Sequence, residues 1–157
     1  MKKHILILSL AWFPFESGGE NAPRNIAERL CGDYDFDVIT YRFKKEWPRE
    51  ECRAHKAFLC ARGTQEGLVC SGRVYRVGGV NKYDWMFRAF LKACSLHRER
   101  PYGLVWSIMA AYAGGVAYWF KLFHPRIPLL LTLQEGDPLE HIMRRVGITR
   151  PWFRDLF

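Results

Sequence analysis

The chain has 157 residues, with 24 Lys and Arg against 16 Asp and Glu and a formal charge of +8 at pH 7. At about 100–200 residues per domain, this length holds one domain and excludes a complete two-domain enzyme. Hydrophobic residues make up 49% of the chain and charged residues 25%, which excludes a disordered or collagenous protein. Nearly all of the excess positive charge lies after residue 60, a distribution that suits an anionic membrane, a phosphorylated ligand or nucleic acid.

Short apolar runs alternate with helical patterns along the chain. Runs rich in Val, Ile and Leu predict buried strands at residues 5–10, 36–41, 73–77, 104–108 and 128–133. Apolar residues at helical spacing predict helices at residues 20–31, 83–98, 110–123 and 141–146. Residues 44–72 break the alternation, and we predict an irregular excursion there. The pattern predicts one α/β domain over residues 1–157, a Rossmann-like open parallel sheet with helices on both faces.

The helical spacing also predicts which side chains face the core. The expected core residues are Ala22, Ile26, Ala27 and Leu30 in the first helix, and Phe87, Phe90, Leu91 and Cys94 in the second. Residues 101–120 carry no charge and are long enough to cross a bilayer. They nevertheless contain several glycines and tyrosines and divide into a strand-like and a helix-like run, so we predict no membrane span.

The cysteines predict a reducing environment. Five Cys without a C-x-x-C pair make a poor disulfide framework, which favours free thiols and a cytoplasmic location. Three of these cysteines stand near a histidine in a cluster of zinc-type ligands: Cys52, His55, Cys60 and Cys70. The spacing of this cluster fits known zinc modules poorly, so we predict no metal site. The alternative is a non-enzymatic Rossmann-like interaction module that uses residues 44–72, with a Cys/His metal cluster, as its contact surface.

Ligands of open parallel sheets bind beyond the carboxyl ends of the strands, where the strand order reverses. Gly18 and Gly19 follow the first strand at the entrance of a helix, where a phosphate or sugar can approach the backbone. The same glycines also suit a simple strand-to-helix turn. The loop matches neither the dinucleotide nor the P-loop fingerprint, so we expect no bound cofactor. We predict that Gly18, Gly19 and Glu20 contact substrate.

Polar residues also follow the later strands. Met109 comes directly after the strand at 104–108, and Glu135 and Asp137 follow the last strand. Asp137 suits the N-cap of a helix with Pro138 at its first position. Glu135 can accept a substrate hydroxyl or act as a base. We predict substrate contacts for Met109 and Asp137 and a catalytic role for Glu135.

The first loop, W-F-P followed by Gly-Gly and a helix ending A-E-R-L, resembles the start of glycosyltransferases of the GT-B fold, of the family-4 type. Three further segments match in order: DFDVITY, ERPYGLVWSIMAAYAGGVAYWFK and PLLLTLQEGDP. The resemblance implies sugar transfer from a nucleotide-sugar donor in a cleft between two Rossmann-like domains, usually retaining and without a metal. It implies that Gly18 and Gly19 lie near the donor diphosphate. Gln134 stands where many members have a His near the transferred sugar, which implies a catalytic position for a residue that cannot titrate.

The resemblance also implies a second domain. Most donor-binding residues of the family, including an E-x7-E motif, belong to a C-terminal domain that these residues do not supply. We therefore expect a truncated acceptor-side domain that is inactive alone. Its expected partners are a nucleotide-sugar donor, a sugar or lipid-linked acceptor and the missing donor-binding domain.

The basic second half suits peripheral contact with the inner face of a membrane. The candidate surface consists of Tyr83, Trp85, Met86, Arg88 and Lys92, although Phe87, Phe90 and Leu91 are expected in the core. We expect no nucleic-acid partner, because the sequence carries no recognisable nucleic-acid-binding module and no clustered basic helix.

Overall fold

The structure is a computed structural model that describes residues 2–14, 18–53 and 72–133. These residues form one six-stranded sheet with the strand order β3-β4-β2-β1-β5-β6. The strands are β1 (Lys3–Leu8), β2 (Tyr34–Tyr41), β3 (Glu50–Arg53), β4 (Gly72–Val77), β5 (Leu104–Ile108) and β6 (Leu129–Thr132). The helices are α1 (Gly18–Leu30), α2 (Lys82–Glu99) and α3 (Tyr112–Phe123). All strand pairs are parallel except β3 with β4.

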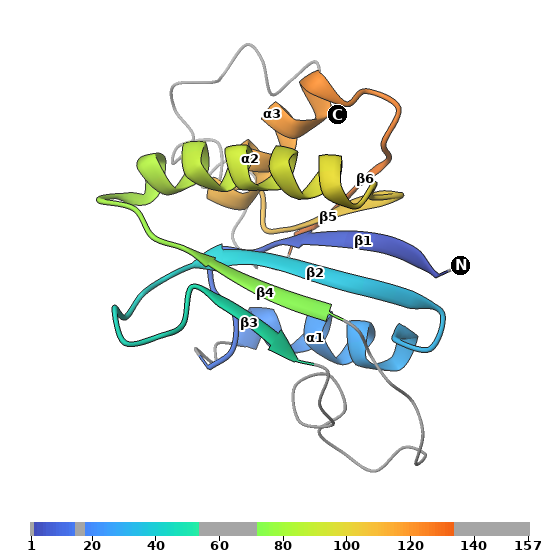
Figure 1. The fold of residues 1–157 in the computed structure, drawn as a ribbon, viewed down its shortest axis with the longest axis horizontal. Helices are drawn as coiled ribbons and strands as arrows, with labels where there is room; N and C mark the ends of the chain where they lie inside the picture. The colour runs from blue at the N-terminus through green and yellow to red at the C-terminus, as the bar shows by residue number, and fades with distance from the viewer. Residues whose placement is uncertain (1, 15–17, 54–71, 134–157) are drawn as a thin grey trace.

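The helices cover both faces of the sheet, as the sequence predicts: α1 lies on one face, and α2 and α3 lie on the other (Figure 1). Successive side chains of a strand point to opposite faces. Ile5 and Ile7 of β1 therefore pack in the cluster with α1, while Leu6 and Leu8 pack in the cluster with α2 and α3. A central strand buried on both faces must be apolar at every position, which explains the uninterrupted apolar run of β1.

The segment 44–72 is not irregular throughout, contrary to the prediction. It contains β3, which pairs antiparallel with β4 from Glu50 opposite Tyr75 to Arg53 opposite Gly72. An edge strand needs no apolar face, and charged residues protect its open side from pairing with other chains. The polar sequence EECR therefore gives no strand signal. Residues 54–71 and the helix predicted at 141–146 lie outside the described residues.

The predicted core face of α2 is correct for Phe90 and Cys94, which are partly buried against the core, and wrong for the other two residues. Phe87 and Leu91 point to solvent with 54% and 50% of their surface exposed. The buried residues are Trp85, Ala89, Ala93 and Leu96. Alanines on the inner face let α2 lie close to the sheet and to α3, and Trp85 supplies most of the buried volume. An apolar residue at helical spacing is thus not a reliable sign of the core when the helix carries more than one apolar stripe.

The first helix shows the same kind of shift. Ile26 and Leu30 were expected in the core but are 45% and 39% exposed. Residues Pro23, Ala27 and Cys31 are buried instead, so only Ala27 was placed correctly. Small residues again form the contact with the sheet, and larger apolar side chains lie at the rim.

The uncharged stretch 101–120 divides as predicted, into β5 and the greater part of α3. Neither α3 nor any other helix in the described residues has the length and apolarity needed to cross a bilayer.

Of the two cysteines whose side chains the structure describes, one differs from the prediction. Cys31 is buried and disulfide-bonded, so the expectation of free thiols is wrong there. Cys94 is free, and burial raises the pKa of its thiol. Since disulfides persist in oxidising compartments, the cysteine pattern no longer argues for a cytoplasmic location. The side chains of Cys52, His55, Cys60 and Cys70 lie outside the described residues. Within the described residues, no three His, Cys, Asp or Glu side chains are placed to hold a metal ion.

A buried polar network joins the sheet to α2 away from the carboxyl ends of the strands. Asp37 of β2 accepts a hydrogen bond of 2.7 Å from the Tyr102 hydroxyl and one of 3.1 Å from the backbone N–H of Arg73. The backbone N–H of Tyr102 donates to Nδ1 of His97 at 3.0 Å. Burial raises the pKa of Tyr102 and, with a further contribution from His124, lowers the pKa of His97. Both side chains are therefore held neutral, which this hydrogen-bond pattern requires.

Candidate functional site

The strand order defines a switch point between β1 and β5. From β1 the chain adds β2 and β4 on one side of β1, and then returns to add β5 and β6 on the other. The paired register sets Leu8 of β1 beside Ser107 of β5, so the segments that follow these two residues leave the same edge of the sheet. Ligands of such sheets bind at this place, because the chain departs in opposite directions and leaves a crevice.

The loop after β1 is held against β2. The Ser9 N–H donates to Ile39 O at 3.1 Å, and the carbonyl of Leu10 accepts from Tyr41 N at 3.1 Å and from the Thr40 hydroxyl at 3.2 Å. The chain then enters α1 at Gly18, so Gly18 and Gly19 form the first helical turn, as predicted. N–H groups of a first helical turn lack intrahelical acceptors and carry the positive end of the helix dipole. The side chain of Glu20 lies outside the described residues.

Met109 follows β5 on the other side of the switch point. Its φ of 70° is in the left-handed region, which is unusual for a residue other than glycine. Hydrogen bonds hold it there, because its N–H donates to Thr132 O at 2.9 Å and its carbonyl accepts from the Ser107 hydroxyl at 3.3 Å. A left-handed backbone conformation at a residue other than glycine costs about 1–3 kcal/mol, and such residues cluster at functional sites. Sequence reasoning placed Met109 at this edge, and the structure does too.

The helix that follows Met109 begins without a side-chain cap. The N-cap position of α3 is Ala111, which offers no acceptor to the first turn. Two helices, α1 and α3, therefore begin at the carboxyl edge of the sheet, one after each strand of the switch point. Each supplies N–H groups and a positive dipole end at this edge of the sheet.

Arg76 is a structural residue of this edge that sequence reasoning missed. Only 3% of its surface is exposed. Its Nη2 donates to Phe13 O at 3.1 Å, its Nη1 to Pro48 O at 3.5 Å, and its guanidinium lies 5.8 Å from the Trp47 ring centre. It thereby joins the loops after β1 and β2 to β4. A charged residue inside an apolar strand is the signal that marks it, because buried charges require dedicated partners.

The remaining predicted site residues are Gln134, Glu135 and Asp137. They follow β6 along the chain and lie outside the described residues. Of the predicted positions, the described residues include the first turn of α1 and Met109, which follow the neighbouring strands β1 and β5.

A mostly parallel sheet of this strand order, with helices on both faces and a switch point between β1 and β5, defines a Rossmann-like α/β domain. No family model matches the sequence, and no curated protein matches it. Among solved structures, a sucrose-phosphate synthase from Thermosynechococcus elongatus aligns with a TM-score of 0.49 and 11% sequence identity. The alignment covers 85% of this chain and 64% of that chain, so the present chain spans less than two-thirds of its length. The fold class rests on the strand order and the placement of the helices, not on this alignment.

Proposed function

We propose that this chain is the acceptor-side domain of a glycosyltransferase. It acts with a second, donor-binding domain to move a sugar from a nucleotide-sugar donor to a sugar or lipid-linked acceptor. The observation that carries the proposal is the pairing of a Gly-Gly helix start with the left-handed backbone of Met109 across one switch point. Glycines at a helix start let a diphosphate reach backbone N–H groups that side chains would otherwise cover.

The chemistry follows from the groups at this edge. The negative charge that develops on a leaving diphosphate is stabilised by the N-terminal N–H groups and dipoles of α1 and α3. We assign Gln134 and Glu135 to hydrogen bonds with sugar hydroxyls close to the transferred group, and Asp137 to the acceptor. The sequence resemblance alone extends the proposal to a retaining, metal-independent transfer.

Titration of the ¹⁵N-labelled chain with UDP, GDP, ADP and their glucose conjugates tests the site. We expect amide shifts in the first turn of α1 and at Met109. Substitution Gly19→Ala should weaken binding about tenfold, the loss of roughly one charge-assisted hydrogen bond. Gly103→Ala is the matched control, because Gly103 lies before β5 at the opposite edge and an added Cβ meets only His4 O at 3.9 Å.

Shifts confined to other parts of the chain, or equal weakening by both substitutions, would contradict the proposed site. We expect no sugar transfer by these 157 residues alone, because the resemblance assigns most donor-binding residues to a second domain. Clear turnover by the purified chain would contradict the need for a second domain.

A second proposal concerns the outer face of α2, which we propose contacts an anionic membrane surface. Tyr83, Phe87 and Leu91 form a stripe, four residues apart, with exposed fractions of 69%, 54% and 50%. Arg88 and Lys92 lie beside this stripe and supply positive charge. Apolar side chains flanked by basic ones are the pattern of interfacial helices. Trp85, which the sequence also suggested for this surface, is fully buried and takes no part.

The double substitution Phe87→Ser with Leu91→Ser should reduce co-sedimentation with phosphatidylglycerol-containing vesicles more than about tenfold. It removes the two exposed apolar side chains that enter the membrane interface in this proposal. The matched control is Val80→Ser with Leu122→Ser, which removes two exposed apolar side chains outside the stripe. Binding should also fall with added salt. Equal binding by both double variants, or equal binding to neutral phosphatidylcholine vesicles, would contradict membrane contact through α2.

A further inference from the structure

A basic pocket lies beside the carboxyl ends of β2 and β4, to one side of the switch point. It has a volume of about 400 Å³ and opens between α2, β4 and the start of β3. Its charged lining residues are Arg42, Arg49, Glu50, Arg76, Arg88 and Lys92. β2 separates β4 from β1 in the sheet, so this pocket is distinct from the crevice between β1 and β5.

Uncharged groups hold two of these cations in place. Arg42 donates from Nε to Trp47 O at 2.7 Å and from Nη2 to the carbonyl of Lys45. The ammonium group of Lys92 lies 4.5 Å from the centre of the Tyr75 ring. Backbone carbonyls and an aromatic ring orient a cation without neutralising it. The pocket therefore keeps the positive charge of both residues.

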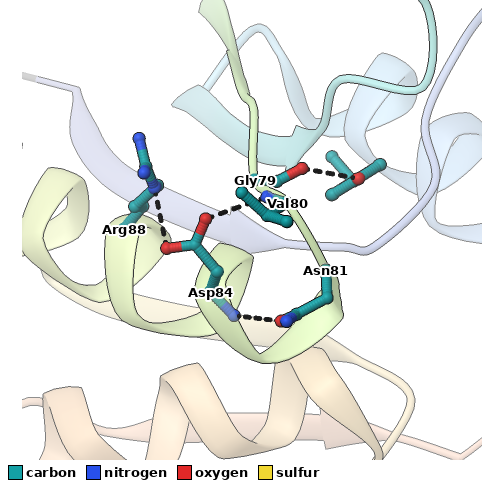
Figure 2. Close-up of polar contacts among 6 residues, drawn as sticks. Gly79, Val80, Asn81, Asp84 and Arg88 are labelled. Carbon is teal, nitrogen blue, oxygen red and sulfur yellow. Dashed lines mark hydrogen bonds and ion pairs between the residues drawn. The ribbon is translucent and has the colours of Figure 1, made fainter.

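Carboxylates are few in this region and are already engaged. Asp84 accepts from Arg88 Nε at 2.9 Å, and its other oxygen accepts from the Val80 N–H at 2.9 Å (Figure 2). Glu50 is the one carboxylate of the described residues that lines the pocket, and it pairs at 3.5 Å with Arg73, which is not a lining residue. Among residues 2–14, 18–53 and 72–133, no carboxylate lies within 4 Å of the basic groups of Arg42, Arg49 or Lys92.

Several like charges that converge on one cavity repel one another, and a bound anion removes this cost. Guanidinium groups match the oxygens of a phosphate in geometry as well as charge, and lysine adds a point charge. The concave shape and small volume suit a compact ligand rather than an extended nucleic acid. We propose that this pocket binds a phosphoryl group, carried either by a small phosphate monoester or by a phospholipid headgroup. The proposal is independent of the sugar-transfer site at the switch point.

The test compares two doubly substituted full-length chains that have lost the same charge. Arg49→Gln with Lys92→Gln alters the pocket, and Arg29→Gln with Arg98→Gln removes two cations outside it. Inorganic phosphate and glycerol 3-phosphate are titrated by calorimetry against sodium chloride of equal ionic strength. We expect the pocket variant to bind phosphate about tenfold or more weakly than the unsubstituted chain, and the control variant to stay within about twofold.

A second arm measures co-sedimentation with vesicles of phosphatidic acid in phosphatidylcholine. Pocket-dependent binding of the soluble phosphates alone supports the pocket and identifies a small phosphorylated ligand. Vesicle binding alone supports the pocket and identifies a headgroup if it also falls in the single variant Arg49→Gln, which leaves the surface of α2 unchanged; vesicle binding that Arg49→Gln does not weaken counts against the pocket. Absence of binding in both arms, or equal losses in both double variants, would overturn the proposal. Melting curves in sodium chloride without phosphate verify that each variant is folded. If the pocket double variant is unfolded, the single variant Lys92→Gln is compared with the single variant Arg98→Gln instead.

Discussion

Substitution Trp85→Ala is expected to lower the free energy of unfolding by about 3–5 kcal/mol. Trp85 is fully buried between α2 and the sheet, and its ring lies 6.4 Å from that of Tyr41 in an edge-on arrangement. Removing it loses the transfer free energy of a large aromatic side chain and leaves a cavity in the larger of the two core clusters. Urea denaturation followed by circular dichroism measures the change.

Phe87→Ala is the matched control for this substitution. Phe87 lies on the same helix, two residues further on, and sequence periodicity alone places it in the core. Because its side chain is 54% exposed, we expect a loss of less than about 1 kcal/mol. A larger loss for Phe87→Ala than for Trp85→Ala would contradict the orientation of α2.

Substitution Gly79→Ala is expected to cost about 2–4 kcal/mol, the sum of steric crowding and a weakened helix cap. An added Cβ would lie 2.8 Å from the backbone nitrogen of Trp85 and 3.0 Å from the carbonyl oxygen of Asn81. Backbone atoms cannot swing aside, so the start of α2 must shift. The shift would disturb the N-cap, in which Asn81 Oδ1 accepts from the Asp84 N–H at 2.8 Å (Figure 2).

Gly78→Ala provides the comparison for Gly79→Ala within the same loop. No atom lies within 4 Å of a Cβ added at Gly78, so its substitution should change the free energy of unfolding by less than about 1 kcal/mol. Thermal melts of both variants measure the difference. Equal melting temperatures would show that the chain between β4 and α2 can relax, and would contradict the close approach at Gly79.

The parallel strands were predictable because each contains a short apolar run, which in β1 and β5 reflects burial on both faces. In β6 the run predicts the strand but not its burial, since Leu129 and Leu130 are 37% and 46% exposed. The antiparallel β3 was not, since an edge strand is stabilised by backbone pairing with β4 rather than by an apolar side-chain pattern. The rotation of α2 was missed for a related reason. Both its inner face and its outer stripe are apolar, and only packing against α3 and the sheet selects Trp85 over Phe87.

The candidate site was predictable where it depends on chain order alone. Gly18, Gly19 and Met109 follow the first and fourth predicted strands, so the rule for parallel sheets places them at one edge. The phosphoryl pocket was not predictable. Its cations come from the end of β2, the start of β3 and the outer side of α2, and the unpredicted pairing of β3 with β4 brings Arg49 toward Lys92.

The buried guanidinium of Arg76 has a consequence for mutational screens. It binds carbonyl groups of two separate loops, so those loops and β4 form one mechanical unit. A screen for lost function would recover substitutions of Arg76 as readily as those of residues that contact ligand, because the shape of the edge would change with them. Loss of function on substitution of Arg76 therefore reports on the packing of the two loops against β4, whereas loss of function on substitution of the exposed Arg49 reports on ligand binding in the proposed pocket.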